Sequence, residues 1–110
     1  MRIIEIDGSD WQSVKDFLTA LRAAIGAPDW HGWSVNAFID SMIWGGINQI
    51  EPPYEIRISG CECVPKEVTD HIDLLASALA DARKWKLDNR GEDTEAVSYT
   101  HLTLPTKRIV

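Results

Sequence analysis

Cysteine is scarce in this sequence: there are only two, Cys61 and Cys63, with one residue between them. A disulfide-rich secreted domain has an even set of spaced cysteines, and a structural zinc site needs a second pair of ligands. A lone C-x-C has neither. We therefore expect two reduced thiols and no metal site.

Long apolar runs are also missing. No run approaches the roughly 18 residues that cross a bilayer. The N-terminus, MRIIEIDGSD, lacks the apolar centre of a signal peptide. These features predict a cytoplasmic protein with no membrane partner.

Basic residues are outnumbered. There are 11 Lys and Arg residues against 17 Asp and Glu residues, for a net charge of -6. Like charges repel, so nucleic acid is not an expected partner, whereas a basic macromolecule is a suitable one. Solubility explains the same surplus without a partner, and on charge alone it is the simpler explanation.

Catalytic and cofactor-binding motifs are not evident either. Gly45-Gly46 is not followed by the lysine of a phosphate-binding loop. His31 and Asp40 have the chemistry of an acid and base pair, but no serine or cysteine nucleophile has a determined place beside them. We expect no cofactor, and an enzyme is the least favoured class of function.

The sequence does contain enough regularly spaced apolar residues to form the core of one domain. The 110 residues are 45% hydrophobic, and a chain of this size buries about two thirds of its unfolded surface. A strand is expected over Arg2 to Ile6, before the turn signal Asp7-Gly8. A helix follows, with Ser9 and Gln12 at the spacing of a capping box and Gly26 at its end. Its apolar residues recur at steps of three and four: Trp11, Val14, Phe17, Leu18, Leu21 and Ile25.

Two more helices and another strand complete the pattern. A second helix is expected from Ser34, as N-cap, to about Trp44. The alternating stretch from Tyr54 to Ile58 predicts a half-buried strand. Pro65 is placed to begin a third helix that fades near Asn89-Arg90-Gly91. One apolar stripe runs along it: Val68, Ile72, Leu75, Leu79 and Ala82. Strands that alternate with helices predict an α/β domain with a parallel sheet and its connecting helices on one face.

The C-terminal string VSYTHLTLPTKRIV differs from the rest, because every acidic residue lies at or before Glu95. The string resembles the translation of a sequencing-library adapter. We therefore expect a domain over residues 1–95 and a non-native tail over residues 96–110 in place of the last strand. A genuine C-terminus is the alternative, and Val97 and Tyr99 have the character of a strand that ends by Pro105.

The second helix has two distinct faces. With a step of ~100° per residue, Phe38, Ile39 and Met42 fall within about 60° of Val35 and form a core stripe. Three other residues follow one another at i, i+4 and i+8 and turn away from the core: Asn36, Asp40 and Trp44. An exposed tryptophan is typical of a binding surface, and an aspartate near it can bond an incoming arginine or lysine.

The loop before this helix contains Trp30, His31 and Trp33, which can join the same surface. Other roles fit these residues as well. Trp30 can cover the core beneath the loop, and Trp33 can pack as a hydrophobic staple before the N-cap. Asp40 can be an ordinary solvated carboxylate.

Three segments together resemble the barstar family: Pro28-Asp29-Trp30-His31-Gly32, then Asn36-Ala37-Phe38-Ile39-Asp40, then Trp44-Gly45 and the following strand. The order of elements agrees from Arg2 to about Arg90. The resemblance implies a small parallel sheet of about three strands, with helices packed mainly on one face. It also implies an intracellular inhibitor that blocks the active site of a secreted ribonuclease.

The resemblance assigns roles to particular residues. In the family, the loop aromatics and one face of the short helix enter the ribonuclease site, where a carboxylate contacts the basic residues that bind phosphate. That carboxylate matches Asp40. A second family carboxylate matches Asn36, which cannot form an ion pair, and two loop tyrosines match Trp30 and His31. An acidic residue of the family's third helix aligns only loosely with Asp81.

The leading hypothesis is therefore a non-enzymatic antitoxin or immunity protein, monomeric when free, that inhibits a basic ribonuclease or related nuclease toxin. Its expected contact residues are Asp40, Asn36, Trp44, Trp30, His31 and Trp33. The alternative is an interaction module of the same fold that binds a non-nuclease partner, or itself, through the tryptophan surface.

Overall fold

The computed structural model describes residues 2–101, and their side chains as far as residue 96. Three strands form one parallel sheet in the order β1 (Arg2–Asp7), β2 (Tyr54–Ser59) and β3 (Ala96–His101). The central strand is β2, which pairs in register with both neighbours. The sheet is the small parallel sheet that the sequence predicts.

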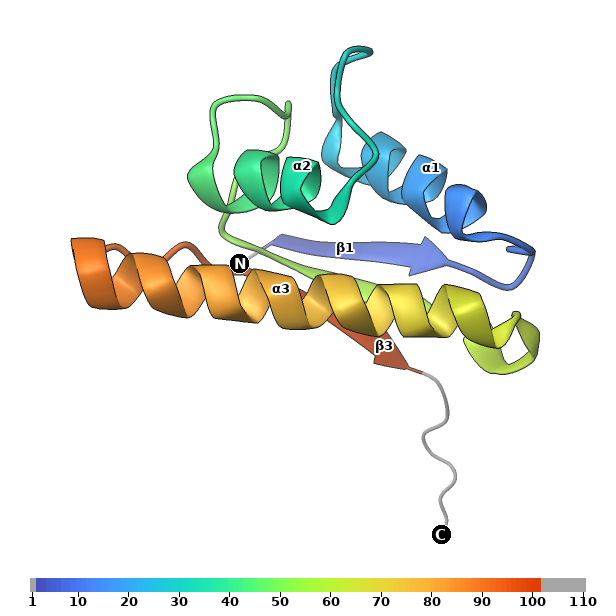
Figure 1. Ribbon diagram of the computed structural model, residues 1–110. Coiled ribbons are helices and arrows are strands. Elements are labelled where there is room, and N and C mark those ends of the chain that lie inside the picture. The colour runs from blue at the N-terminus through green and yellow to red at the C-terminus, as the bar shows by residue number, and fades with distance from the viewer. Residues whose placement is uncertain (1, 102–110) are drawn as a thin grey trace, which may run out of the picture.

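The helices lie in the two connections between strands. The first connection contains α1 (Val14–Ile25) and α2 (Val35–Ile39), which continues into a π-helical turn, η1 (Asp40–Trp44). The second contains a short 3₁₀ turn, η2 (Cys61–Cys63), and the long helix α3 (Lys66–Arg90). Figure 1 shows α1, α2 and α3 on the same side of the sheet, as right-handed crossovers between successive parallel strands require.

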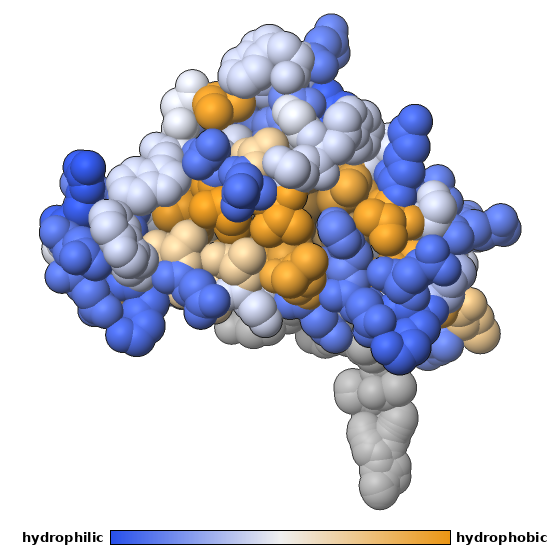
Figure 2. Space-filling view, in the orientation of Figure 1, coloured by the Kyte–Doolittle hydropathy of each residue, from blue (hydrophilic) through white to orange (hydrophobic). Residues whose placement is uncertain are grey.

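The core lies between this side of the sheet and the helices. Tyr54, Ile56 and Ile58 of β2 are fully buried, whereas Arg57 is exposed, so β2 buries one face only. Figure 2 shows apolar residues in the middle of the helical side of the molecule, with hydrophilic residues at both ends. The helices supply most of the remaining core: Phe17, Leu18, Leu21, Ile25, Phe38, Met42, Ile43, Val68, Ile72, Leu75 and Leu79.

The start of α1 differs from the prediction. The N-cap is Ser13, whose Oγ accepts a hydrogen bond from the Asp16 backbone N–H at 3.3 Å, and Asp16 in turn accepts from the Gln12 N–H at 2.9 Å. Trp11 precedes the helix, because its N–H donates to the Gly8 carbonyl in a turn. The Trp11 ring is still buried, with its centroid 5.4 Å from that of Phe17. Trp11 therefore fits the three- and four-residue spacing of the apolar residues, although it lies before the helix begins.

The strand β3 is formed by residues that the sequence assigns to the tail. Ala96–His101 pairs with β2, and the Tyr54 N–H donates to the Glu95 carbonyl at 2.8 Å. This is the arrangement that the strand-like character of Val97 and Tyr99 suggests. Residues 102–110 lie outside the described residues, and the non-native origin of the stretch stays a prediction.

Both cysteines are free thiols, as predicted. Cys61 is buried in η2 and Cys63 is exposed. Burial, followed by the charges of Glu62 and Asp7, raises the pKa of the Cys61 thiol. The neutral thiol of Cys61 is therefore favoured.

Tyr54 carries an unusual polar group in this core. Its side chain is fully buried, and its hydroxyl has no hydrogen-bond partner among the described residues. Burial and then the charge of Glu51 raise the pKa of Tyr54 far above its usual range. The folded chain therefore keeps the phenol protonated where an exposed tyrosine ionises.

Replacing Tyr54 by phenylalanine is expected to stabilise the fold. Near neutral pH, Tyr54→Phe should raise the free energy of unfolding by about 1 kcal/mol, because it removes a buried hydroxyl without a partner. Above about pH 10 the difference should widen, since the unfolded wild type then releases the phenol proton that the folded state retains. Urea unfolding at both pH values measures the effect. A wild type and a variant with the same pH dependence would contradict this account of Tyr54.

Two glycines of the first connection provide a matched pair: Gly26, which caps the end of α1, and Gly46, which follows the C-cap of η1. Gly26 (φ 67°) and Gly46 (φ 79°) both adopt left-handed backbone angles. A Cβ at Gly26 would lie 2.7 Å from Gln49 Cβ, whereas a Cβ at Gly46 would meet nothing within 4 Å. Gln49 cannot easily move away, because its backbone N–H donates to the Gly26 carbonyl at 3.0 Å.

Gly46→Ala should therefore cost about 1 kcal/mol of stability, which is the ordinary penalty of left-handed angles. Gly26→Ala should cost clearly more, because steric overlap with Gln49 adds to the same penalty. Chemical denaturation of the two variants measures the difference. Equal losses would show that the contact with Gln49 relaxes without cost.

Candidate protein-binding surface

The short helix presents its polar residues outward, on a well-defined frame. Ser34 caps α2, as predicted, and its Oγ accepts from the Ala37 N–H at 3.1 Å. Phe38 and Met42 are fully buried, and Val35 and Ile39 are half-buried. The residues of the opposite row, Asn36, Asp40 and Trp44, are all exposed.

The helix is not α-helical throughout. It changes to a π-helical turn at Asp40, whose N–H donates to the carbonyls of both Ala37 and Asn36. The sequence predicts a continuous α-helix, because periodicity does not reveal a local insertion of this kind. Turns of the π type occur frequently at functional sites. This one runs from Asp40 to Trp44, two of the residues that the sequence predicts to contact a partner.

Asp40 of the short helix is an exposed carboxylate. Among the described residues, it has neither an ion pair nor a side-chain hydrogen bond, and the same holds for the amide of Asn36. The carboxylates of Asp93 and Asp88 differ, because Asp93 pairs with Arg83 and Asp88 pairs with Lys84. Asp40 is therefore open to a cation of a partner.

The two loop tryptophans are not part of the core. Trp30 is 72% exposed and Trp33 is 42% exposed. The Trp33 ring lies over the guanidinium of Arg22, 4.2 Å from centroid to Cζ. Arg22 also donates to the carbonyls of Pro28 and Asp29, at 3.1 and 3.2 Å. Arg22 of α1 thus holds the loop from which Trp30 projects.

The expected place of His31 on the contact surface needs correction. His31 is only 3% exposed, and its ring lies against Phe38 with the centroids 4.7 Å apart. Its Nδ1 donates to the Gly32 carbonyl at 2.6 Å, and its Nε2 lies 2.8 Å from Ser41 Oγ, a hydroxyl that also bonds the Phe38 carbonyl at 3.3 Å. Both nitrogens are engaged away from Asp40, so the two do not form an acid and base pair. His31 supports the loop from within.

Trp44 is accompanied by a residue that the sequence analysis missed. Its ring packs edge-on against Trp85 of α3, with centroids 6.0 Å apart and an interplanar angle of 62°. Trp85 is itself 53% exposed. A signal for it was present, since Trp85 lies three residues after Ala82 and continues the apolar stripe of α3.

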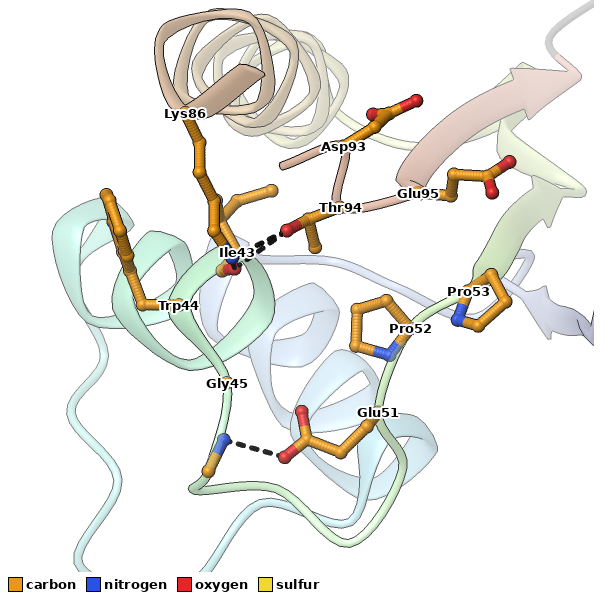
Figure 3. Close-up of a pocket in the computed structure, with 11 residues that line it drawn as sticks. Ile43, Trp44, Gly45, Glu51, Pro52, Pro53, Lys86, Asp93, Thr94 and Glu95 are labelled. Atoms are coloured by element: carbon orange, nitrogen blue, oxygen red, sulfur yellow. Dashed lines mark hydrogen bonds between the residues drawn. The ribbon is translucent and has the colours of Figure 1, made fainter. Parts of the chain in front are cut away.

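A pocket of about 410 Å³ lies beside Trp44, between the end of η1, the loop before β2 and the segment before β3. Figure 3 shows Lys86 reaching into it from α3. Lys86 Nζ donates to the Ile43 carbonyl at 3.0 Å and to Thr94 Oγ1 at 2.8 Å, and Glu51 accepts from the Gly46 N–H at 2.7 Å. These bonds fix the end of η1, and with it the position of Trp44.

The matching family model is described as Barstar (barnase inhibitor), and it covers residues 1–98. The chain belongs to the barstar family. No curated protein matches the chain. Among the described residues, no helix is both long and apolar enough to cross a membrane.

Membership of the barstar family gives the surface a context. A chain of this family is expected to act by binding a protein. The exposed residues of α2, η1 and the preceding loop form a surface of suitable chemistry: one open carboxylate, one amide and three indoles. We name Asn36, Asp40, Trp44, Trp30 and Trp33 the contact surface.

Removal of the Ser41 hydroxyl tests how the loop of this barstar-family chain is held. Ser41→Ala leaves the buried Nε2 of His31 without a partner and removes the bond to the Phe38 carbonyl, so the free energy of unfolding should fall by about 1–3 kcal/mol. Urea unfolding gives the value. Ser59→Ala, at an exposed position of β2, is the matched control and should change stability by no more than about 0.5 kcal/mol. If the two variants lose the same stability, the contact between His31 and Ser41 does not support the loop.

Proposed function

We propose that this barstar-family chain inhibits a basic ribonuclease or related nuclease toxin by covering its active site. Asp40 takes the place of an RNA phosphate against the basic residues of that site. The observation that carries the proposal is the exposed Asp40 carboxylate, without an ion pair in the described part of the chain, on a capped helix between exposed indoles.

The charge of the chain supports this function. A ribonuclease binds phosphate through basic groups, and a net charge of -6 speeds its encounter with such a protein. A carboxylate that bonds an arginine or lysine at the centre of an interface forms a charge-assisted hydrogen bond, which is stronger than a neutral one. Asp40 supplies the charge, and Asn36 supplies an uncharged polar contact one turn earlier.

The indoles supply the apolar part of the interface. Trp30 projects from the loop with most of its ring exposed, and Trp44 lies beyond Asp40 on the same row of the helix. Tryptophan is enriched among the residues that dominate binding energy at interfaces. Trp33, which is 42% exposed, contributes the part of its ring that Arg22 and Lys15 do not cover. Cytoplasmic location and a monomeric free state belong to this proposal.

The role of Asp40 is tested by charge removal at constant shape. Asp40→Asn should weaken inhibition of a basic ribonuclease by about 10- to 100-fold, because a hydrogen bond to a charged group contributes about 1.5–3 kcal/mol. Hydrolysis of RNA by barnase, titrated with each variant, provides the measurement. The loss should shrink at high salt, which screens the same charge.

Asp73→Asn is the matched control. It removes the same charge from an exposed position of α3, so it reports the effect of net charge alone. It should change inhibition by no more than a few-fold. If Asp40→Asn and Asp73→Asn inhibit alike, or if the wild type does not inhibit at all, Asp40 does not have the assigned role.

A second function has one observation in its favour. Four exposed indoles, those of Trp30, Trp33, Trp44 and Trp85, would also suit a non-nuclease partner or a second copy of the chain. Sedimentation at rising concentration separates self-association from inhibition. A dimer that forms without a nuclease, and that Trp44→Ala disrupts, would favour this alternative.

A further inference from the structure

A second apolar feature lies next to the contact surface, on α3. Trp44, Ala82 and Trp85 line an open pocket of about 280 Å³. The two indoles are 42% and 53% exposed, although tryptophan is a large apolar side chain. We name this feature the indole pocket. It adjoins the contact surface because Trp44 belongs to both.

The rim of the indole pocket is cationic, unlike the chain as a whole. The guanidinium of Arg90 lies 5.3 Å from the Trp44 ring, and Lys86 Nζ lies 5.1 Å from it. Lys86 already bonds the Ile43 carbonyl and Thr94, and the carboxylate of Glu92, 3.8 Å away, pairs with its charge. Arg90 is exposed, and no carboxylate pairs with it among the described residues. The free charge at this rim is therefore that of Arg90.

Asp40 and Arg90 thus place opposite charges around Trp44. Asp40 precedes Trp44 by one turn of the short helix, and Arg90 approaches its ring from α3. A partner that meets both must carry a basic group and an acidic group on either side of an apolar one. Opposite charges of this kind fix the orientation in which two proteins dock.

We infer that the indole pocket binds an apolar, preferably aromatic, side chain next to a carboxylate, on a segment of the ribonuclease outside its phosphate site. The identity of the protein that carries this segment rests on the proposed function. An aromatic ring fits because two indoles in edge-on arrangement offer it both a face and an edge. The carboxylate is matched to Arg90, which can bond it in a bidentate manner.

The chemistry of the pocket can be tested without the ribonuclease. The probes are three blocked tripeptides: Asp-Phe-Glu, Asp-Ala-Glu and Lys-Phe-Lys. The readout is the indole N–H resonances of Trp44 and Trp85 in the ¹⁵N-labelled full chain, assigned with Trp→Phe variants. Asp-Phe-Glu should shift both resonances in a saturable way, with a Kd at least about tenfold below those of the other two peptides.

The net charge of the chain makes the comparison stringent. A charge of -6 attracts Lys-Phe-Lys to the protein as a whole. A preference for the acidic peptide can therefore only arise from the local charge at the indole pocket. If Lys-Phe-Lys binds as well as Asp-Phe-Glu, or if neither indole responds, the inference is wrong.

Three variants locate the response. Arg90→Glu should abolish the preference for the acidic peptide, and Trp85→Ala should remove saturable binding. Leu87→Ala is the matched control, because Leu87 is an exposed apolar residue of the same helix outside the pocket lining. Its binding should equal that of the wild type. Equal losses of peptide binding in Trp85→Ala and Leu87→Ala would contradict the inference. If Trp85→Ala does not fold, Arg90→Glu still tests the role of charge.

Failure of the pocket and failure of the proposed function give different results. A wild type that binds Asp-Phe-Glu at the two indoles but does not inhibit a ribonuclease rejects the function and leaves the chemistry of the pocket in place. A wild type that inhibits through Asp40 but shows no response of Trp85 rejects the pocket alone.

Discussion

Phe38, Met42 and Ile43 bury one side of the short helix in the core, where the helix packs against α3, and the whole contact surface depends on that burial. A segment of α2 and η1 is too short to be helical alone in water, since helices of this length are marginal. Its apolar side must therefore be covered for the opposite side to keep a fixed shape. Bonds from Lys86 to Ile43 and Thr94 then secure its C-terminal end.

Because buried residues on the opposite side of the short helix fix the contact surface, its exposed groups need no partners within the chain. Asp40 is without an ion pair in the described residues, and Trp30 keeps most of its ring in solvent. Groups held rigidly before binding lose less conformational entropy when a partner arrives. His31 contributes to this rigidity from inside the loop rather than by contact, and Arg22 holds the same loop from α1.

The sequence predicted the elements well wherever local chemistry decides them. Ser34, Gly26 and Pro65 mark helix boundaries through capping and backbone angles, and the structure places helices at all three. The start of α1 was misplaced because two serines, Ser9 and Ser13, both precede acceptable capping partners. Only the turn from Gly8 to Trp11 selects the second. Periodicity likewise could not reveal the π-helical turn.

The sequence by itself determined the outward row of Asn36, Asp40 and Trp44, because their spacing on one helix separates them from the core stripe. The tertiary structure alone decided which aromatic residues of the loop and of α3 belong to the surface. The buried ring of His31 bonds Ser41, ten residues later in the chain. The exposed Trp85 belongs to the surface only because its ring packs against Trp44. Such contacts join segments whose separation along the chain leaves no periodic signal, so only the packing of helices against one another establishes them.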